Sequence, residues 1–246
     1  MTRVALVTGA TRGIGLGLAC RLAKEGYSVA LTYRSRSDLA KVITDQIKAD
    51  GHHALAIQMS VENRSSVRQA LGLINKHFGS VDVLVNNAAI AQEKPFETIT
   101  DQDWDEMMGV NLRGPFVCSQ ECLPNMVEQG WGRVINVSSI GGQWGGINQV
   151  HYAASKAGLI NLTRSLARLY SGSGVTTNAL AIGLVSTDMS ATELATEAGQ
   201  AKVRAIPRGR IGTVRDIADA VTFLASDQSD YVTGQTININ GGMYFG

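Results

Sequence analysis

The chain has 246 residues, of which 44% are hydrophobic, and its 22 lysines and arginines against 21 aspartates and glutamates leave a formal net charge of +1. This length fits one α/β domain with a large core, so we expect a single domain over residues 1–246. A net charge near zero without a run of like charges excludes the basic surface that nucleic acids and anionic membranes need, and indicates a small-molecule partner.

The cysteines and the N-terminal sequence indicate a reducing compartment. Cys20, Cys118 and Cys122 are too few and too unevenly spaced for a disulfide framework, and no Cys/His cluster has metal-ligand spacing, so we predict no metal site. The chain enters an apolar run at Val4 without the hydrophobic stretch of a signal peptide, and no run of about eighteen apolar residues occurs. We therefore expect a cytosolic protein that does not bind membranes.

The first elements form a strand, a glycine turn and a helix. Val4–Thr8 is typical of a buried parallel strand, the turn reads Gly9-Ala-Thr-Arg-Gly13-Ile-Gly15, and the apolar periodicity of Ile14–Ala23 predicts a helix. Glycines there let the backbone approach a pyrophosphate, and the helix offers its unpaired N–H groups to the anion. Many glycine turns only cap a helix, but this position favours nucleotide binding.

The tip of the next strand, Ser28–Tyr33, indicates which nucleotide binds. An NAD site usually carries Asp or Glu there for the ribose hydroxyls, and that carboxylate would repel a 2′-phosphate. Here the tip reads Tyr33-Arg34-Ser35-Arg36, and Arg12 lies in the glycine turn. A solvated loop would explain any one of these arginines, but three of them without an acid predict NADP(H) as the cofactor.

Strands and helices then alternate. We expect helices at Leu39–Ala49, Ser65–Phe78, Asp101–Gln129, Ala153–Tyr170 and Val214–Ala225, and strands at Ala54–Met59, Val81–Val85, Arg133–Val137, Val175–Leu180 and Thr236–Asn240, with an irregular segment at Gly183–Ile211. This order predicts an α/β fold, a Rossmann-type doubly wound parallel sheet flanked by helices, with ligands at the carboxyl ends of its strands.

A proline interrupts the expected helix Asp101–Gln129. Pro115 has no N–H to donate to the carbonyl of Asn111, so that oxygen needs another partner. A water held there would connect Lys156 to solvent, whereas a plain proline kink would need no water. The sequence leaves both possibilities open.

The stretch Asn136–Lys156 carries residues suited to acid–base chemistry. Tyr152 and Lys156 are four residues apart on an expected helix, so their side chains share one face. A nearby ammonium favours the phenolate, so we expect Lys156 to lower the pKa of Tyr152 from its usual ~10 and make it a general acid or base. Ser139, at the end of a strand, is placed to hydrogen-bond the oxygen that Tyr152 protonates. Ordinary helices also carry Tyr and Lys at this spacing, so the context decides.

Together these motifs resemble those of the short-chain dehydrogenase/reductase family, over essentially the whole chain. The matching elements are Thr8-Gly9-x-x-x-Gly13-Ile14-Gly15, Asn86-Asn87-Ala88, Asn111, Ser139, Tyr152-x-x-x-Lys156, Thr187-Asp188-Met189, Val232-Thr233-Gly234-Gln235 and Gly241-Gly242. The resemblance implies hydride transfer to or from a nicotinamide. It implies Tyr152 as the acid/base, Ser139 as the substrate anchor, Lys156 as the ribose ligand and pKa tuner, and Asn111 as the holder of a water.

Within that family the chain is most similar to the 3-oxoacyl reductases of fatty acid biosynthesis, which act on thioesters of acyl carrier protein or of CoA. The cofactor contacts expected from the motifs and the resemblance are Gly9, Thr11, Arg12, Gly13, Ile14, Gly15, Tyr33, Arg34, Ser35, Ser60, Val61, Asn87, Ala88, Tyr152, Lys156, Gly183, Val185 and Thr187. NADP(H) is the expected cofactor.

Four departures from the family pattern affect the site. Ala89 stands where the family usually has glycine, Ser60 replaces an aspartate that binds the adenine, and Ile182 replaces a proline. The segments 128–130 and 171–174 lack the basic residues that carrier-protein reductases usually have there. An acidic carrier protein would find little complementary charge, so carrier protein and CoA both remain open.

Substrate contacts are expected from Ser139, Gln143, Trp144, Gln149 and Tyr152. We place the pocket between the 140–151 loop, the Ile90–Phe96 loop and the 188–206 segment. A mostly apolar pocket with one amide suits a short acyl chain whose second carbonyl Gln149 orients. A reductase of a small ketone, quinone or polyketide-type substrate is the alternative. A non-catalytic nucleotide-binding or scaffold protein is a further one, although it would not need the complete Ser/Tyr/Lys/Asn set.

The helices 101–129 and 153–170 carry more apolar residues than one stripe facing a sheet needs. We therefore expect an outer face of each to pack on a neighbouring subunit, and the family resemblance implies a homotetramer.

Overall fold

The computed structural model describes residues 2–187 and 194–246. At its centre lies a seven-stranded parallel sheet in the order β3-β2-β1-β4-β5-β6-β7. The strands are β1 (Val4–Val7), β2 (Ser28–Tyr33), β3 (Ala54–Gln58), β4 (Val83–Asn86), β5 (Gly132–Ser139), β6 (Val175–Ile182) and β7 (Thr236–Ile239). The predicted Rossmann-type α/β fold is confirmed.

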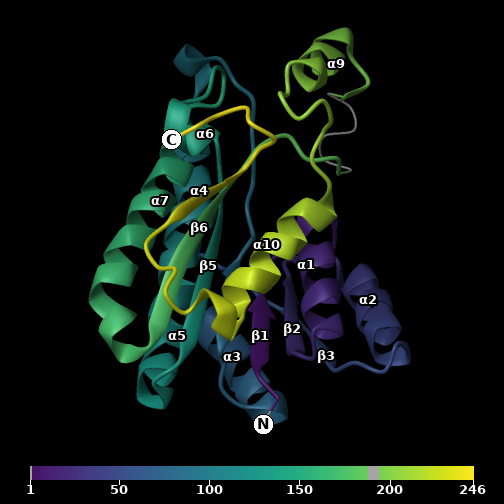
Figure 1. The fold of residues 1–246 in the computed structure, drawn as a ribbon, viewed down its shortest axis with the longest axis vertical. Helices are drawn as coiled ribbons and strands as arrows, with labels where there is room; N and C mark the ends of the chain where they lie inside the picture. The colour runs from purple at the N-terminus through teal and green to yellow at the C-terminus, as the bar shows by residue number, and fades with distance from the viewer. Residues whose placement is uncertain (1, 188–193) are drawn as a thin grey trace.

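Helices cover both faces of the sheet (Figure 1). One face carries α1 (Gly13–Lys24), α2 (Ser37–Ala49) and α10 (Val214–Ala225), and the other carries α3 (Arg64–Phe78), α4 (Asp101–Met108), α5 (Gly114–Gln129) and α7 (Val150–Tyr170). Two short helices, α6 (Gly141–Trp144) and α9 (Glu197–Arg204), lie beyond the carboxyl ends of the strands. None of the helices in the described part of the chain is both long and apolar enough to cross a membrane.

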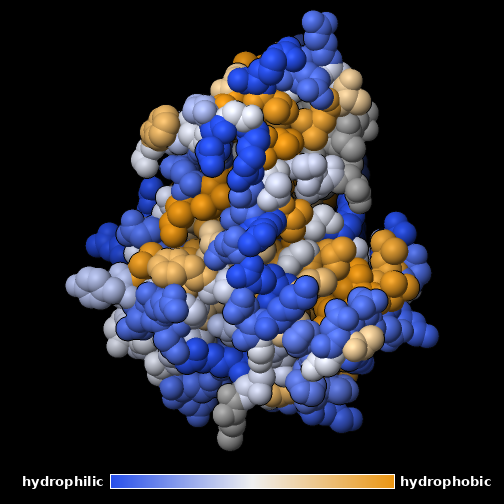
Figure 2. All heavy atoms as spheres, turned by 45° about the vertical axis from the view of Figure 1, so that its right-hand side comes forward, coloured by the Kyte–Doolittle hydropathy of each residue, from blue (hydrophilic) through white to orange (hydrophobic). Residues whose placement is uncertain are grey.

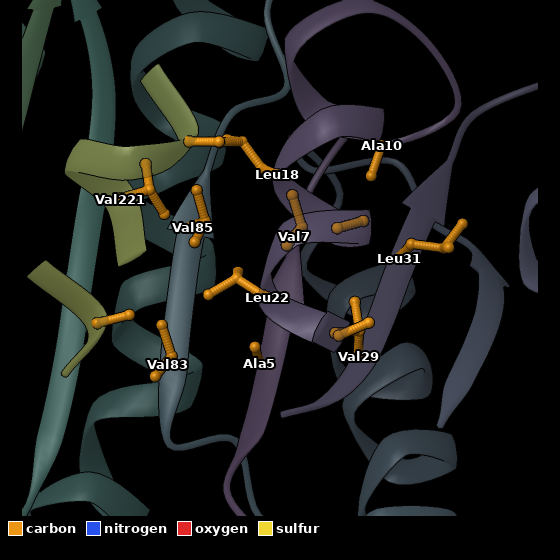
Figure 3. Packing of buried hydrophobic residues seen from close by; sticks show 14 of the residues in the cluster. Ala5, Val7, Ala10, Leu18, Leu22, Val29, Leu31, Val83, Val85 and Val221 are labelled. Atoms are coloured by element: carbon orange, nitrogen blue, oxygen red, sulfur yellow. The ribbon is translucent and has the colours of Figure 1, made fainter. Parts of the chain in front are cut away.

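The sheet is apolar on both faces because both are covered. Every residue of β1 and β4 is buried, as expected for the middle strands of a parallel sheet. Leu18 and Leu22 of α1 lie over Val7 and Val85 (Figure 3), and all four side chains are fully buried. Each such side chain stabilises the fold by roughly 1.5–3 kcal/mol.

The position of the candidate site follows from the strand order. β1 pairs with β2 on one side and with β4 on the other, so the connections leave the middle of the sheet in opposite directions. Ligands of such sheets bind in the crevice outside the carboxyl ends of the strands at this point.

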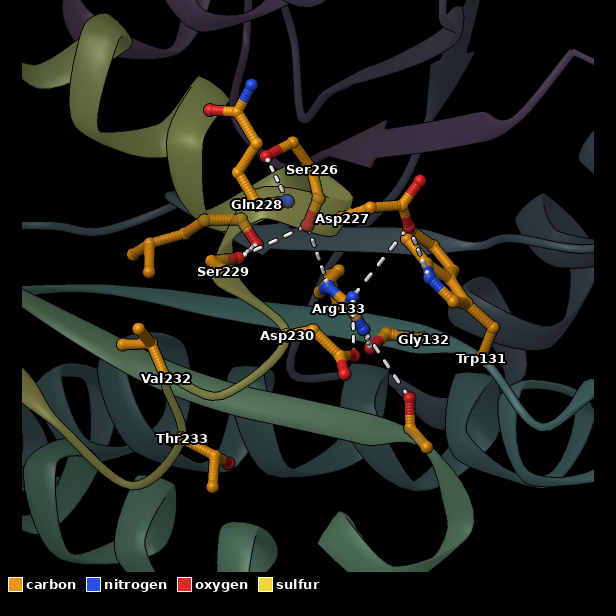
Figure 4. Close-up of polar contacts among 12 residues, drawn as sticks. Trp131, Gly132, Arg133, Ser226, Asp227, Gln228, Ser229, Asp230, Val232 and Thr233 are labelled. Carbon is orange, nitrogen blue, oxygen red and sulfur yellow. Dashed lines mark hydrogen bonds and ion pairs between the residues drawn. The ribbon is translucent and has the colours of Figure 1, made fainter.

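A cluster of charged and aromatic side chains fixes the opposite, amino-terminal end of β5 (Figure 4). Arg133 is fully buried, and it donates to the carbonyl of Ser226 (3.2 Å) and to Oδ1 of Asp230 (3.2 Å). The guanidinium carbons of Arg3 and Arg133 lie 3.7 Å and 4.3 Å from the ring centre of Trp131. Burial lowers the pKa of Arg133, and its carbonyl and carboxylate partners offset the cost of burying the charge. The cluster ties β5 to the segment before β7.

The expected helix Asp101–Gln129 is interrupted. A π-helical segment, Gly109–Arg113, separates α4 from α5, and the N–H of Gly114 bonds to the carbonyl of Gly109. The wider turn accommodates Pro115 at the start of α5, where its missing N–H costs little. The interruption is therefore a π turn, which neither a plain kink nor a continuous α-helix describes.

The sequence predicts a loop at 140–151 and short helical pieces within 188–206, and both segments contain helical turns. α6 forms one turn inside the 140–151 loop, and α9 lies inside the segment predicted as irregular, Gly183–Ile211. The prediction for Asp188 and Met189, and the first part of the 188–206 pocket wall, fall outside the described residues.

Candidate active site

The turn after β1 packs closely against the end of β4. Gly9 has a φ of 65°, in the left-handed region that favours glycine, and a Cβ there would lie 2.9 Å from the Cα of Ala88. Asn87 donates from Nδ2 to the carbonyl oxygens of Thr8 (2.9 Å) and Gly9 (3.1 Å). A Cβ on Gly15 would clash with this same Nδ2. The glycines are thus required where the turn approaches the neighbouring strand.

A cavity of about 520 Å³ lies over these strand ends, within the range of small-molecule sites. Its walls come from the turns after β1 to β4 and from α7. The predicted cofactor residues that line it are Gly9, Thr11, Arg12, Gly13, Ile14, Gly15, Tyr33, Arg34, Ser35, Ser60, Val61, Asn87, Ala88, Tyr152, Lys156 and Thr187. The residues predicted to bind the cofactor therefore lie together around one cavity in the structure.

Two predicted cofactor residues do not line this cavity. Gly183 follows β6, where its N–H bonds to the carbonyl of Ile239 at 3.0 Å. Val185 is 6% exposed, packs in the core beside α10, and forms an isolated bridge with Gly212. Their role toward a cofactor stays a prediction.

The first turn of α1 can receive an anion. Its N-cap residue, Arg12, is extended and makes no side-chain hydrogen bond to the helix, and the first turn contains no acidic residue. Gly13, Ile14 and Gly15 of this turn line the cavity. The free N–H groups and the positive end of the helix dipole therefore suit a pyrophosphate.

The arginines at the tip of β2 are exposed and loosely paired. Arg34 lies 3.9 Å from Glu106 and Arg36 lies 3.3 Å from Asp38, with both arginine side chains more than half exposed. Exposed pairs of this kind contribute roughly 0–1 kcal/mol, so a phosphate dianion competes well for the same guanidinium groups. Arg12 lines the cavity as well.

Tyr152, Lys156 and Ser139 meet where α7 passes the end of β5. The Nζ of Lys156 lies 5.7 Å from the ring centre of Tyr152 and donates to the carbonyl of Val137 at 2.8 Å. Ser139 lies close enough to Tyr152 to act on the pKa of its phenol, and its Oγ accepts from the N–H of Gly141 at 3.1 Å, so the turn of α6 fixes the serine. These contacts hold a hydroxyl, a phenol and an ammonium together at one edge of the cavity.

Burial dominates the titration of these groups. It raises the pKa of Tyr152 above 10, with the hydrogen bond to Ser139 acting in the opposite direction, and it lowers the pKa of Lys156 to about 8. The prediction that the pKa of Tyr152 lies below its usual value is therefore wrong for this structure. Desolvation of the phenolate outweighs the attraction of an ammonium that sits beside the ring. The phenol stays protonated at neutral pH, which suits a proton donor.

Asn111 is fully buried in the π segment and holds a loop. Its Oδ1 accepts from the N–H of Ile90 and its Nδ2 donates to the carbonyl of Ile90, both at 2.9 Å. The same Nδ2 lies 3.2 Å from Oγ of Ser155, beside the catalytic candidates on α7. The side chain thus ties the chain after β4 to α7, and its role toward a water stays a prediction.

The walls of the expected substrate pocket adjoin each other. Lys94 donates its N–H to the carbonyl of Asn148 at 2.7 Å, and Gln149 donates from Nε2 to Glu93 at 3.3 Å. Trp144 is half exposed and meets Tyr244 edge to face, with ring centres 6.0 Å apart. The C-terminal segment, which sequence analysis did not include, therefore forms part of this side.

Of the five expected substrate residues, Tyr152 lines the cavity, Ser139 lies directly after its lining residue Ser138, and Gln143, Trp144 and Gln149 lie farther out, toward α6 and the start of α7. A space-filling view shows apolar side chains gathered near the upper end of the molecule, where α9 lies (Figure 2). Several residues that line the cavity were not among the predicted contacts, namely Thr32, Met59, Glu62, Val110, Val137 and Ser138. Most of them sit at carboxyl ends of predicted strands, and that position alone could have indicated them.

Across residues 2–187 and 194–246, no group of His, Cys, Asp or Glu side chains could hold a metal ion.

Known proteins match this chain over nearly its whole length. The family model described as enoyl-(acyl carrier protein) reductase matches residues 9–244. A protein of Staphylococcus aureus (strain Mu50) named 3-oxoacyl-[acyl-carrier-protein] reductase FabG is 44% identical over 244 residues, covering 99% of both chains. Proteins of the same name from Aquifex aeolicus and Vibrio cholerae are 40% and 41% identical, covering 98% of this chain and 97% of theirs.

Among solved structures, a crystal structure of a proposed gluconate dehydrogenase from Agrobacterium tumefaciens superposes with a TM-score of 0.94 at 31% identity. It covers 98% of this chain and 95% of that one.

Proposed function

Because the chain belongs to the short-chain dehydrogenase/reductase family, an oxidoreductase family that acts on CH–OH and C=O groups with a nicotinamide cofactor, we propose that it is an NADPH-dependent 3-oxoacyl thioester reductase. It reduces the 3-oxo group to a 3-hydroxyl group. The observation that carries the proposal is the meeting of Ser139, Tyr152 and Lys156 at the edge of the glycine-lined cavity.

The residues of the cavity fit a dinucleotide phosphate. The uncapped first turn of α1 suits the pyrophosphate, and Arg12, Arg34 and Arg36 suit a 2′-phosphate that an acidic residue at the tip of β2 would repel. When bound, the nicotinamide supplies a hydride to the carbonyl carbon of the substrate.

The side chains of the protein handle the proton. Tyr152 donates its phenolic hydrogen to the carbonyl oxygen as negative charge develops there, and Ser139 hydrogen-bonds the same oxygen. The raised pKa of Tyr152 keeps this hydrogen in place until the reaction needs it. The ammonium of Lys156, beside the ring, stabilises the phenolate that results.

The thioester is proposed from the relatives and from the pocket. The relatives named 3-oxoacyl-[acyl-carrier-protein] reductase share 40–44% of their residues with this chain over its full length. Gln149 and Trp144 border the proposed substrate side, where an amide orients the second carbonyl and an aromatic ring packs on the acyl chain. We further propose that the protein works in the cytosol as a single-domain subunit of a homotetramer.

Absorbance at 340 nm, followed with NADPH against a panel of carbonyl compounds, tests this proposal. The panel contains acetoacetyl-CoA, acetoacetyl-acyl carrier protein, a quinone and a simple ketone, each at matched concentration. We expect the highest kcat/KM with one of the two thioesters, and their ratio identifies the carrier. Turnover of the quinone or the ketone with neither thioester reduced would contradict the proposal.

A further inference from the structure

His151, the residue before Tyr152, connects the catalytic helix to the wall of the substrate pocket. Its side chain is fully buried in the first turn of α7. The ring Nε2 lies 2.8 Å from Oε1 of Gln92, in the loop between β4 and α4. The proton transfer proposed above does not use this contact, so we consider what else the His151–Gln92 hydrogen bond does.

The direction of this hydrogen bond is fixed by a carboxylate. Gln92 donates from Nε2 to Oδ1 of Asp103 at 2.9 Å, and a carboxylate only accepts, so the amide NH₂ group faces Asp103. The amide oxygen therefore faces His151, and the ring nitrogen Nε2 must carry the hydrogen. The other ring nitrogen, Nδ1, is buried without a partner among the described residues.

Asp103 is itself held firmly. It accepts from the N–H and the hydroxyl of Thr100, at 2.9 Å and 2.6 Å, in the capping box that starts α4, and it pairs with Lys94. Hydrogen bonds from Lys94, Thr100 and Gln92 hold the pKa of this carboxyl well below its usual range. The carboxylate thus stays ionised. The two hydrogen bonds are therefore donated in one direction, from His151 to Gln92 and from Gln92 to Asp103.

Besides its contacts with Asp103 and the exposed Glu93–Gln149 hydrogen bond, the loop is attached to its surroundings at three places. Asn111 binds both backbone groups of Ile90, a residue that lines the cavity, and the N–H of Lys94 binds the carbonyl of Asn148. His151 holds Gln92, between these two points. Without this contact the middle of the loop would be joined to α4 through Asp103, and to the helix that carries Tyr152 only through the exposed 3.3 Å contact of Glu93 with Gln149, the N-cap residue of α7.

We propose that His151 is a positioning residue that sets the distance between the wall formed by Ile90–Lys94 and the reacting hydroxyl of Tyr152. The ring does not touch the substrate and acts through Gln92. This inference rests on the proposed function only in placing the substrate beside that wall. It therefore concerns whichever carbonyl compound the wild-type protein reduces.

Three single variants, the double variant His151→Leu/Gln92→Leu and a control separate this role from general stability. His151→Leu and Gln92→Leu each remove one partner of the hydrogen bond, whereas His151→Gln keeps a donor at the position of Nε2. The exposed His53 provides the control His53→Gln. Steady-state kinetics give kcat and KM, nucleotide fluorescence gives the Kd of NADPH, and urea unfolding shows that each variant is folded.

We expect each leucine variant to raise the KM of the carbonyl substrate about tenfold, with kcat and the Kd of NADPH within about threefold of wild type. The double variant should also show about tenfold, because both changes break one contact. His151→Gln should restore KM to within about twofold. A KM in His151→Gln as high as in His151→Leu would overturn the proposal, and so would single effects on KM that multiply in the double variant. If His151→Leu does not fold, the KM of Gln92→Leu decides the test.

A spectroscopic measurement tests the contact without any reaction. The chain contains four histidines, so long-range ¹H–¹⁵N NMR can resolve each ring. We expect one ring in the Nε2–H tautomer whose signals disappear in His151→Gln and shift in Gln92→Leu. A ring of His151 in the Nδ1–H tautomer would overturn the assignment, whatever the substrate of the protein.

Discussion

Replacing Lys156 by methionine should make the protein more stable while it abolishes the reaction. Lys156 is 3% exposed, and burial lowers its pKa from 10.5 to about 8. One pKa unit corresponds to about 1.4 kcal/mol, so keeping the ammonium at this place costs the folded state roughly 3 kcal/mol at pH 7. Methionine fills a similar volume but leaves the carbonyl of Val137 unpaired, which costs about 1–2 kcal/mol. The net gain in the free energy of unfolding is about 1–2 kcal/mol.

The pH dependence of this gain identifies its cause. Because the pKa of Lys156 is lower in the folded state, the unfolded chain binds more protons between about pH 8 and pH 10.5, and wild-type stability rises over that window. The advantage of Lys156→Met should therefore be complete at pH 7 and vanish or reverse near pH 10. Urea unfolding without nucleotide at both pH values measures it, with Lys76→Met on the exposed side of α3 as control. A Lys156→Met protein that is less stable at pH 7, or whose difference from wild type is equal at both pH values, would refute the reasoning.

Four other predictions concern the cofactor, the substrate, the sheet and the assembly. Arg34→Ala should raise the KM of NADPH roughly tenfold and leave the KM of NADH unchanged. Asp38→Asn releases Arg36 from its ion pair and should lower the KM of NADPH. Equal changes in the KM of both nucleotides in steady-state kinetics would contradict this. Gln149→Ala should raise the KM of an acetoacetyl thioester several-fold and leave the KM of NADPH nearly unchanged, and the opposite pattern would move the pocket elsewhere. Arg133→Met should lower the free energy of unfolding in urea by about 2–3 kcal/mol, because it removes hydrogen bonds to backbone carbonyls, while the kinetic constants stay the same. Sedimentation equilibrium at micromolar concentration should show a tetramer, and a 26.2 kDa species would count against it.

The elements that the sequence predicts best carry their own local signals. The strand Ser28–Tyr33 and the helix Val214–Ala225 appear with the predicted bounds. The helix has an amphipathic period and a capping box of Thr213 and Asp216, which is a signal within four residues. The glycine turn and the Tyr/Lys spacing are equally local, and the structure brings both to the same cavity.

Features that depend on contacts between distant segments could not be predicted. The π turn at Gly109–Arg113 depends on how Asn111 and Pro115 fit between the chain after β4 and α7. Likewise, the pKa of Tyr152 depends on how deeply the fold buries the phenol, and spacing along a helix does not report burial. The contact of His151 with Gln92 joins residues 59 positions apart.

Tyr152→Phe tests the central assignment most directly, because it removes one hydroxyl and leaves the shape of the side chain. The measurement is the rate of NADPH oxidation at 340 nm with the thioester that the wild type reduces best, beside the Kd of NADPH from nucleotide fluorescence. With Tyr152 as the proton donor, the rate should fall by a factor of about 10²–10⁴ while the Kd stays within about twofold of wild type. A Tyr152→Phe protein that oxidises NADPH at the wild-type rate would contradict the account.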